Sequence, residues 1–332
     1  MSMDEKSIFK RYLNDRPALR RLALSGLSIV SQAAILVKII VLNLFVRPFL
    51  RRPKYDKRYK ISICGIFKNE ALFLKEWIEY HEMIGVEHFY LYNNDSDDHY
   101  KDVLQPYIDR GLVTLTDWPY LHGQMKAYRH FYENYRHETQ WVSFLDLDEF
   151  ICPKDNASLS EWLQKQDRYP VILFYWKIFG TSNIIKHDYS KLVIEQYFLS
   201  WKHFDTYGKC IVNTDYDIAR YDGHTHHETA LRCKVAGIGF ILLPMNVFGH
   251  LVSRKVHFGD CRRCDEAKVQ INHYQSMAWD VYDKKRKMPN VFFKDNPRKS
   301  LNYFYNHEER CNTSDYSIFR FLIRLKNKMN II

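Results

Sequence analysis

Short apolar runs alternate with amphipathic segments along residues 60–180, and this pattern predicts alternating strands and helices. The apolar runs are typical of buried strands, and the segments between them carry apolar residues at helical spacing. The expected strands are Ile61–Phe67, Val86–Tyr92, Leu112–Trp118, Trp141–Leu145 and Pro170–Trp176. We therefore predict an α/β fold with a doubly wound, mostly parallel sheet and helices on both of its faces.

Local signals mark the ends of the expected helices. Asn69 can cap the first helix and Gly85 can end it, because these residue types favour those positions. The next two helices are expected at Asp97–Asp109 and Gln124–His137. Ser158 and Glu161 have the spacing of a capping box and predict a fourth helix.

Polar residues follow three of the expected strands. These strand ends read Lys68-Asn69-Glu70, Asn93-Asn94-Asp95-Ser96-Asp97-Asp98 and Asp146-Leu147-Asp148-Glu149. Ligands of parallel α/β sheets bind beyond the carboxyl ends of the strands, so we expect the chemistry there. The chain contains neither G-x-G-x-x-G nor G-x-x-x-x-G-K-[ST], which disfavours a Rossmann dinucleotide enzyme and a P-loop NTPase.

The basic character of the chain is confined to its N-terminal segment. Residues 1–60 carry 14 Lys and Arg against four acidic residues, whereas the remaining residues carry 35 of each kind. The balanced body disfavours a nucleic-acid binder. The apolar run Leu22–Leu50 contains Lys38 and has basic flanks, which favours a helix lying on an anionic membrane surface over one that crosses the bilayer. A buried core helix is the alternative.

These patterns divide the chain into a membrane-associating segment 1–59, a main domain 60–295 and a basic amphipathic helical segment 296–332. The last segment is expected either to contact the membrane or to pack on the main domain. The short connection from the apolar run to the main domain favours the cytoplasmic face of a bacterial inner membrane, and a Golgi membrane is the alternative.

Seven cysteines are scattered along the chain, and their odd number favours reduced thiols over a disulfide framework. Cys261 and Cys264 have C-x-x-C spacing, with His257 and His273 nearby. A structural zinc site is therefore an alternative for this segment, although the usual spacing of four ligands is not reproduced.

The segment WVSFLDLDEF (Trp141–Phe150) is the most informative motif. An apolar strand delivers Asp146 and Asp148, with Glu149 next to them. Carboxylates so close repel one another unless a cation neutralises them. Mg²⁺ and Mn²⁺ prefer oxygen ligands and are often bound together with phosphates, so the motif predicts a site for a divalent metal. A solvated acidic turn is the alternative.

Several motifs in order resemble glycosyltransferase family 92, the domain-of-unknown-function-23 group, and its bacterial relatives. The resemblance covers roughly residues 60–290 and rests on ICGIFKNEALFLKEWIEYHEMIGVEHFYLYNNDSDD, QWVSFLDLDEFICP, FYWKIFGTSN, GKCIVN and INHY. It implies a GT-A fold with a D-x-D metal motif. It also implies inverting transfer of a hexose, often galactose, from a UDP-sugar. We expect the acceptor to be a glycan or, because of the membrane-associating segment, a lipid-linked glycan, and the metal to be Mn²⁺ or Mg²⁺.

The resemblance also implies roles for individual residues. Asp148 would hold the metal, Asp146 would contact the metal, the sugar or the ribose, and His273 would be a third metal ligand or a diphosphate donor. The implied nucleotide-binding residues are Phe67, Asn69, Glu70, Asn93 and Asn94, and the implied acceptor-side residues are Trp176, Phe179, Gly180 and Ser182.

The chain departs from the family pattern after His273, where Gln275-Ser276-Met277 replaces the usual aromatic residue, Lys and Ser. We therefore expect a diphosphate-binding lysine elsewhere, with Lys284 and Lys285 as candidates. Asn93 also stands where the family usually has Asp, which leaves the base contact open.

An inverting transferase needs one general base. Glu195 aligns with a glutamate usual in the family and is the first candidate, and Asp222 and Glu228 are the alternatives. Two other functions compete with this interpretation: a membrane-anchored glycan-binding module without catalysis, and a D-x-D phosphatase. The phosphatase motif follows the first strand, whereas this one follows the fourth.

Overall fold

The computed structural model describes residues 37, 41, 56–155, 158–216, 231–235, 238–242, 244–250, 252, 260–287 and 300–331. The chain divides into two compact units, Met1–Leu50 and Arg51–Ile332. The strands of the second unit are β1 (Tyr59–Phe67), β2 (His88–Asn93), β3 (Val113–Asp117), β4 (Thr139–Phe144), β5 (Glu149–Pro153), β6 (Val171–Ile178), β7 (Leu199–Trp201), β8 (Gly208–Asn213), β9 (Leu231–Val235), β10 (Ile238–Leu242), β11 (Met245–Asn246), β12 (Val269–His273) and β13 (Cys311–Ser314). Its helices are α4 (Ala71–Met83), α5 (Tyr100–Asp109), α6 (Gln124–Asn134), α7 (Leu159–Gln164), α8 (Val193–Gln196), η3 (Asp260–Arg262), η4 (Cys264–Glu266), α9 (Trp279–Lys287), α10 (Leu301–Glu308), η6 (Ser317–Phe321) and α11 (Leu322–Lys328).

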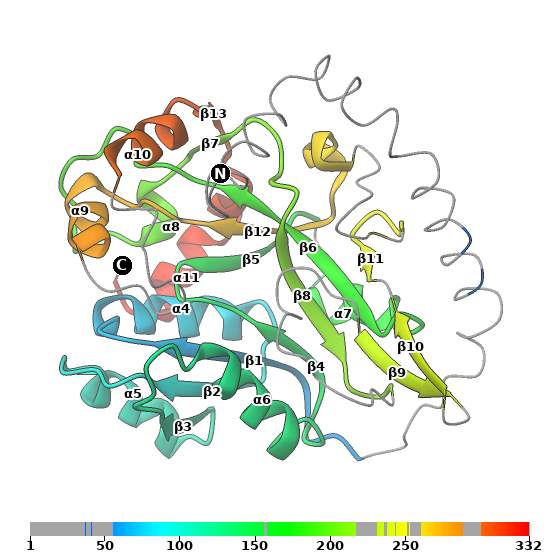
Figure 1. Ribbon diagram of the computed structural model, residues 1–332. Coiled ribbons are helices and arrows are strands. Elements are labelled where there is room, and N and C mark those ends of the chain that lie inside the picture. Colours follow the sequence, from blue (N-terminus) through cyan, green and yellow to red (C-terminus); the bar gives the residue numbers. More distant parts are fainter. Residues whose placement is uncertain are drawn as a thin grey trace. The chain divides into compact units, whose positions relative to one another are not determined.

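Within the described residues, nine strands form one sheet in the order β3-β2-β1-β4-β8-β6-β12-β5, with β11 also paired to β6 (Figure 1). The half from β3 to β4 is parallel, as predicted. The other half is mixed, because β8 runs antiparallel to both β4 and β6, and β5 runs antiparallel to β12. The α/β class is confirmed, but the sheet is mixed and its parallel character is confined mainly to the first half.

Alternating side chains of β1 and β2 bury both faces of the sheet. On one face Phe89 packs against Trp77 of α4, with ring centroids 5.5 Å apart. On the other face Tyr90 packs against Phe131 of α6 at 4.9 Å. Successive strand residues point to opposite faces, so a continuous apolar run needs a helix on each side. The prediction of helices on both faces is therefore confirmed.

The first helix is capped differently from the expectation. Asn69 lies at a φ of 56° and does not cap the helix, whose N-cap residue is Glu70. The amide of Ala71 instead donates to the carboxylate of Asp98, at 2.8 Å. At the other end, Gly85 has a φ of 107° and terminates the helix as predicted. The capping bond of Ser158 to the amide of Glu161 is also confirmed, at 3.1 Å.

Strand β5 lies at the edge of the sheet and is held there by α4. The indole of Trp77 donates to the carbonyl of Glu149 at 2.9 Å, and the hydroxyl of Tyr80 donates to the carbonyl of Ile151 at 2.9 Å. The amide of Ile151 donates to Nε2 of His81 at 3.2 Å. Side chains of one helix thus satisfy the backbone groups that an edge strand leaves unpaired. The same bonds hold the strand that begins at the acidic motif.

We expect His81 to make the stability of the fold depend on pH. Its Nε2 accepts a backbone N–H, so the proton is on Nδ1, which donates to the carbonyl of Trp77 at 2.8 Å. Burial lowers the pKa of His81 to about 3 despite that hydrogen bond. The stability that the neutral ring contributes is present above the unfolded pKa of about 6.5, and it falls as the pH drops from there by up to ~1.4 kcal/mol per unit.

Urea unfolding at pH 6.5 and pH 5 tests this expectation through the difference between variants. His81→Gln keeps a donor and an acceptor but cannot take up a proton, so its free energy of unfolding should fall by about 2 kcal/mol less than that of the wild type. His99→Gln is the matched control, because His99 is exposed and should leave the wild-type slope unchanged. Identical slopes for His81→Gln and the wild type would contradict the assignment.

Strand β8 passes very close to β6. A Cβ at Gly208 would lie 1.8 Å from the carbonyl oxygen of Phe174, so only glycine fits at the start of β8. The neighbouring Lys209 consequently enters the sheet at a fixed position, with its side chain fully buried. This close approach brings a lysine to the acidic motif.

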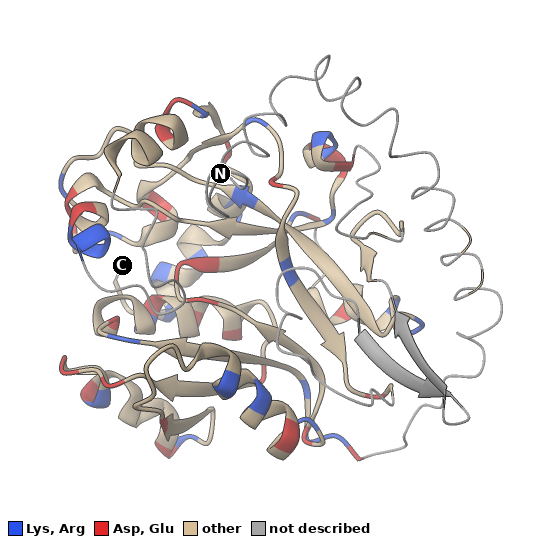
Figure 2. Cartoon of the chain, in the orientation of Figure 1, with Lys and Arg blue, Asp and Glu red and all other residues tan. Residues whose placement is uncertain are grey.

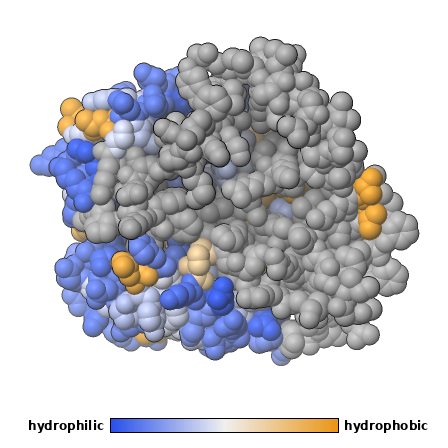
Figure 3. Space-filling model, viewed as in Figure 1, coloured by the Kyte–Doolittle hydropathy of each residue, from blue (hydrophilic) through white to orange (hydrophobic). Residues whose placement is uncertain are grey.

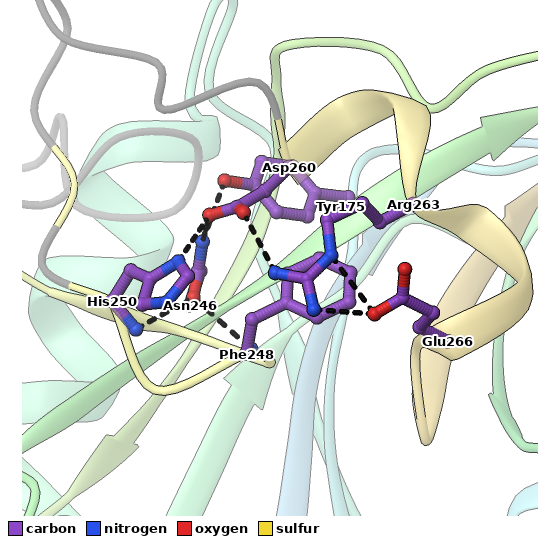
Figure 4. Close-up of polar contacts among 7 residues, drawn as sticks. All are labelled: Tyr175, Asn246, Phe248, His250, Asp260, Arg263 and Glu266. Carbon is purple, nitrogen blue, oxygen red and sulfur yellow. Dashed lines mark hydrogen bonds and ion pairs between the residues drawn. The ribbon is translucent and has the colours of Figure 1, made fainter.

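A second polar cluster holds β11 to the body of the unit (Figure 4). The side-chain amide of Asn246 donates to the hydroxyl of Tyr175 at 3.0 Å and to Oδ2 of Asp260 at 2.6 Å. Asp260 is also 2.9 Å from Nδ1 of His250 and 3.4 Å from the guanidinium of Arg263. Each partner of this buried carboxylate is thus a donor, which explains how η3 is held beside β11.

The C-terminal residues pack on the same unit. Ile318 and Leu325 are fully buried in the core that also contains α4. Lys328 forms ion pairs with Glu79 and Glu82 of α4. The described C-terminal residues therefore pack on the main domain, and contact of this segment with a membrane stays a prediction.

The predicted membrane-associated run Leu22–Leu50 lies outside the described residues, apart from Val37 and Val41. Among the residues that are described, no helix combines the length and apolar character needed to cross a bilayer. On the face shown in Figure 3, the described surface is mostly hydrophilic, with apolar residues in small separate patches. Isolated apolar residues of this kind are normal on protein surfaces.

Candidate active site

The acidic motif forms a tight turn between β4 and β5. The amide of Asp146 donates to Oε2 of Glu149 at 3.0 Å, and the amide of Glu149 donates to the carbonyl of Asp146 at 3.1 Å. Oδ1 of Asp146 accepts from the side-chain amide of Gln124 at 3.0 Å. The turn is therefore closed on itself and fixed from α6, at the carboxyl end of β4.

A buried lysine neutralises two of the three carboxylates. Nζ of Lys209 lies 2.9 Å from Oδ2 of Asp146 and 3.3 Å from Oε2 of Glu149, and the side chains of Lys209 and Glu149 are completely buried. Burial raises the pKa of Glu149 well above its usual value, although Lys209 opposes this shift. Burial alone would lower the pKa of Lys209, but the two carboxylates together raise it. The ammonium is thus charged at neutral pH.

Asp148 faces a different group of side chains. Its Oδ1 is 3.6 Å from Nε2 of His273, and its Oδ2 is 3.8 Å from Nζ of Lys285. Lys285 also lies 3.2 Å from Oε1 of Glu70. The Asp148 side chain is 12% exposed, so it is enclosed but still reachable. The structure therefore brings together Asp148, His273 and Glu70 from three separate motifs.

Charge is only partly balanced around Asp148. Burial raises the pKa of Glu70, and the nearby Asp148 carboxylate raises it further, whereas Lys285 lowers it. Lys285 comes from α9, along which acidic and basic residues mix (Figure 2). The two carboxylates and the imidazole offer oxygen and nitrogen atoms of the kinds that divalent cations bind, and one ammonium lies beside them. Of the two lysines predicted as candidates, Lys285 is the one that contacts this group.

The indole of Trp176 lies beside the same group. Its ring centroid is 4.8 Å from that of His273, and Nζ of Lys209 is 6.0 Å from the Trp176 centroid. An aromatic face next to the acidic turn suits contact with a sugar ring. Trp176 thus lies beside His273, and its contact with an acceptor stays a prediction.

The other acceptor-side residues form the loop that follows β6. Phe179 is fully buried and packs on Tyr274, with ring centroids 4.9 Å apart. The Ser182 hydroxyl accepts from the amides of Phe198 and Leu199, at 2.8 and 2.9 Å. A Cβ at Gly180 would meet Cys311 and Glu308 at 2.7 Å. These contacts are internal to the loop and its neighbours.

Asn93 and Asn94 also make internal contacts. The side-chain amide of Asn93 donates to Oδ1 of Asp117 at 3.0 Å, and the side-chain amide of Asn94 donates to the backbone carbonyl of Trp118 at 2.7 Å. Asn69 accepts from the amide of Asp97 at 2.9 Å. These three residues shape the loops after β1 and β2, next to the buried Phe67. Their contact with a nucleotide stays a prediction.

The three candidates for the general base differ in what the structure shows. Oε1 of Glu195 lies 2.7 Å from Nζ of Lys326, which joins α8 to α11. Its Oε2 accepts from the amide of Leu192 at 3.4 Å. Asp222 and Glu228 lie outside the described residues.

The described side chains of the C-x-x-C segment do not gather as zinc ligands. The Cys261 thiol donates to the carbonyl of Asp205, and the Cys264 thiol donates to that of Lys202. His273 faces Asp148 instead, and His257 lies outside the described residues.

Sequence reasoning missed the role of Lys209 and its neighbour Gln124. The segment GKCIVN contributed only to the resemblance, yet a lysine in an otherwise apolar strand was a usable signal. A charge is seldom buried unless it has a partner, and the three carboxylates of the acidic motif were the available partners.

Comparisons with known proteins agree with these motifs. The family model described as Glycosyltransferase family 92 matches residues 57–234, more than half of the chain. Glycosyltransferase family 92 protein Os08g0121900 of Oryza sativa subsp. japonica is 34% identical over 126 residues, which are 36% of this chain and 22% of that protein. Beta-1,4-galactosyltransferase galt-1 of Caenorhabditis elegans is 26% identical over 243 residues, which are 66% of this chain and 53% of that protein.

Among solved structures, S. aureus TarS 1-349 in complex with UDP is 13% identical, has a TM-score of 0.31 and matches over 47% of each chain. The matched part of the chain spans about a fifth of the length of the rice relative and about half of the length of the nematode relative. Because the family model matches residues 57–234, the chain belongs to glycosyltransferase family 92.

Proposed function

We propose that this chain transfers a hexose, with galactose favoured, from a UDP-sugar to a hydroxyl of a glycan or lipid-linked glycan, with inversion. The family supports a glycosyltransferase, and the nematode relative is named as a galactosyltransferase. The observation that carries the proposal is the meeting of Asp148, His273, Glu70 and Lys285 beyond the carboxyl ends of β1 and β4. A nucleoside diphosphate needs such a cationic and metal-binding position at the edge of an α/β sheet.

The residues present fit Mn²⁺ or Mg²⁺. Asp148 offers a carboxylate oxygen and His273 an imidazole nitrogen, 3.6 Å apart. Neighbouring ligands of an octahedral Mg²⁺ are about 3 Å apart at its usual ligand distances of ~2.1 Å, so a small shift brings both atoms to one ion. When bound, the ion supplies stabilisation of negative charge on the leaving diphosphate.

Each neighbouring side chain then has a distinct task. Lys209 and Gln124 hold the Asp146 carboxylate in place, and its remaining lone pairs would accept from the ribose or the sugar. Lys285 can turn from the two carboxylates towards a diphosphate oxygen, because its stem is long and its side chain is partly exposed. Trp176 offers an aromatic face beside His273 for a sugar ring.

Replacing Lys285 tests the diphosphate assignment. Charge-assisted hydrogen bonds contribute roughly 1.5–3 kcal/mol, so Lys285→Met should weaken UDP binding by about 10- to 150-fold and leave uridine binding unchanged. Lys284→Met is the matched control, since Lys284 is exposed on the same helix. Calorimetric titration with UDP and with uridine measures both effects. A loss shared by uridine, or one produced equally by Lys284→Met, would contradict this role.

Two variants separate a catalytic role of the Glu195 carboxylate as general base from its structural role in the ion pair with Lys326. Removal of a general base costs about 10²–10⁴-fold in rate. If Glu195 is the base, Glu195→Gln should lower turnover by that factor and leave UDP binding intact. Lys326→Met breaks the same 2.7 Å ion pair and keeps the carboxylate, so it should retain turnover. Near-normal turnover of Glu195→Gln would move the role to Asp222 or Glu228.

The two competing functions make different predictions. A glycan-binding module without catalysis would bind glycan but would not hydrolyse or transfer from a UDP-sugar. A D-x-D phosphatase needs Asp146 as an available nucleophile, and here Lys209 and Gln124 engage both of its carboxylate oxygens. Attachment of residues 1–59 to the cytoplasmic face of an anionic membrane stays a prediction.

A further inference from the structure

Helix α10 leads into β13 (Figure 1). A histidine, a glutamate and a cysteine from these two elements meet there. Nε2 of His307 lies 3.8 Å from Sγ of Cys311 and 3.6 Å from Oε1 of Glu308. The three candidate ligand atoms all lie within 4.8 Å of one another. His307 and Cys311 are only 5% and 6% exposed. Nothing in the proposed transfer reaction uses these three side chains.

Two of the three atom-to-atom spacings agree with one tetrahedral zinc ion. Zinc binds sulfur at about 2.3 Å and imidazole nitrogen or carboxylate oxygen at about 2.0–2.2 Å. At the tetrahedral angle these lengths place sulfur ~3.6 Å from nitrogen and nitrogen ~3.4 Å from oxygen. Both distances in the structure exceed these values by only a few tenths of an ångström. Small side-chain movements would therefore complete the coordination.

The surroundings of the cluster suit a metal as well. The amide and the hydroxyl of Thr181 both donate to the Glu308 carboxylate, with the amide 3.1 Å from each oxygen and the hydroxyl at 2.5 Å. Bonds of this kind commonly orient a carboxylate that ligates a metal. At Gly180 a Cβ would lie 2.7 Å from Oε1 of Glu308 and 2.8 Å from Sγ of Cys311. Glycine thus leaves space against two of the three ligand atoms.

We propose that His307, Glu308 and Cys311 bind a zinc ion. A solvent molecule would occupy the fourth position. The ion would tie α10 to β13, and the hydrogen bonds from Thr181 to Glu308 would connect it to the loop that follows β6. This site is chemically distinct from that of Asp148, because its thiolate selects a softer metal than Mg²⁺ or Mn²⁺. The proposal does not depend on the reaction proposed above.

Metal analysis of the full chain, produced without a polyhistidine tag and purified in detergent, tests the site. The wild-type protein should retain one zinc ion per chain after gel filtration in chelator-free buffer. After zinc is exchanged for Co²⁺, a thiolate-to-cobalt charge-transfer band should appear in the near ultraviolet, together with the intense visible bands of tetrahedral cobalt. Cys311→Ser should remove the charge-transfer band and most of the bound zinc.

Two matched variants separate this site from others. Cys261→Ser removes a different thiol, which is partly accessible, and should keep the band. Asp148→Asn removes the proposed manganese ligand and should also keep it, so failure of the transfer reaction leaves this result readable. Wild-type protein that retains no more zinc than Cys311→Ser would overturn the proposal, and so would a charge-transfer band that survives Cys311→Ser. Either outcome would assign the cluster to hydrogen bonding alone.

Discussion

Asp148→Asn should reduce the affinity for UDP in the presence of Mn²⁺ by at least about 100-fold, a loss at or beyond the ~10–100-fold range typical of residues that merely support a metal ligand. Asp148 is the carboxylate that faces both His273 and Lys285, at 3.6 and 3.8 Å. The substitution removes the negative charge and one ligand oxygen while it keeps the shape of the side chain. Turnover should fall with binding, because the leaving diphosphate loses its stabilisation.

The metal dependence distinguishes this result from a general loss of structure. UDP affinity should rise with Mn²⁺ in the wild type and should be independent of Mn²⁺ in Asp148→Asn. Circular dichroism should show the same fold for both, because the backbone carbonyl of residue 148 still accepts from the amide of Tyr274 at 2.8 Å.

Asp95→Asn is the matched control for the change in charge. Asp95 follows β2 and is 79% exposed, and its weak contact is with Lys68. Its φ of 58° is a conformation that asparagine adopts readily, so the substitution should not disturb the loop. Manganese-dependent UDP binding should persist in this variant. If Asp148→Asn retains that dependence, or if Asp95→Asn loses it, Asp148 is not the metal ligand.

Much of the fold was predictable because its strands are short apolar runs with polar ends. The predicted runs Ile61–Phe67 and Trp141–Leu145 correspond to β1 and β4 within two residues at each end. Strand β5 was not predicted, because its first residue, Glu149, is itself the last acidic residue of the motif, and no Gly, Pro or Asn marks the turn before it. Its position depends on hydrogen bonds from α4, which lies some 70 residues earlier in the sequence.

Local signals in the sequence failed where a residue distant in the chain supplies the hydrogen-bonding group that a nearby residue was expected to supply. Asn69 has the residue type of a helix cap, but Asp98 caps the helix from the loop after β2. The lysine missing after His273 was expected elsewhere, with Lys284 and Lys285 as candidates, and Lys285 of the next helix lies 3.8 Å from Asp148. Gln275, which departs from the family pattern, donates to the hydroxyl of Tyr303 at 2.6 Å instead. Spacing along the chain cannot show such exchanges, since they depend on which loops meet.

Lys209 should be the most costly of the buried residues around the site to replace. Lys209→Met leaves the carboxylates of Asp146 and Glu149 without the ammonium that now lies 2.9 and 3.3 Å away. Removal of one partner of a buried ion pair costs about 3–5 kcal/mol, so the free energy of unfolding at pH 8 should fall by that amount. Lys202→Met is the control, because Lys202 is exposed and should change stability by less than about 0.5 kcal/mol.

The pH dependence of this loss identifies its cause. Burial already raises the pKa of Glu149, and without Lys209 that pKa rises further. A carboxyl whose folded pKa is raised destabilises the fold as the pH increases through that pKa, and protonation relieves the cost at lower pH. The difference between Lys209→Met and the wild type should therefore be smaller at pH 5 than at pH 8, as measured by urea unfolding.

A double variant completes the test of the buried pair. Lys209→Met with Glu149→Gln removes both charges, and the carbonyl oxygen of the new amide side chain can still accept from the amide of Asp146, the bond that now measures 3.0 Å. Because the fully buried position 149 then carries no uncompensated charge, and the remaining Asp146 carboxylate is 35% exposed, the double variant should be more stable than Lys209→Met alone at pH 8. Turnover should stay low in both, since Asp146 loses the ammonium that fixes it. Equal stability of the single and double variants would show that the lysine acts through packing and not through charge.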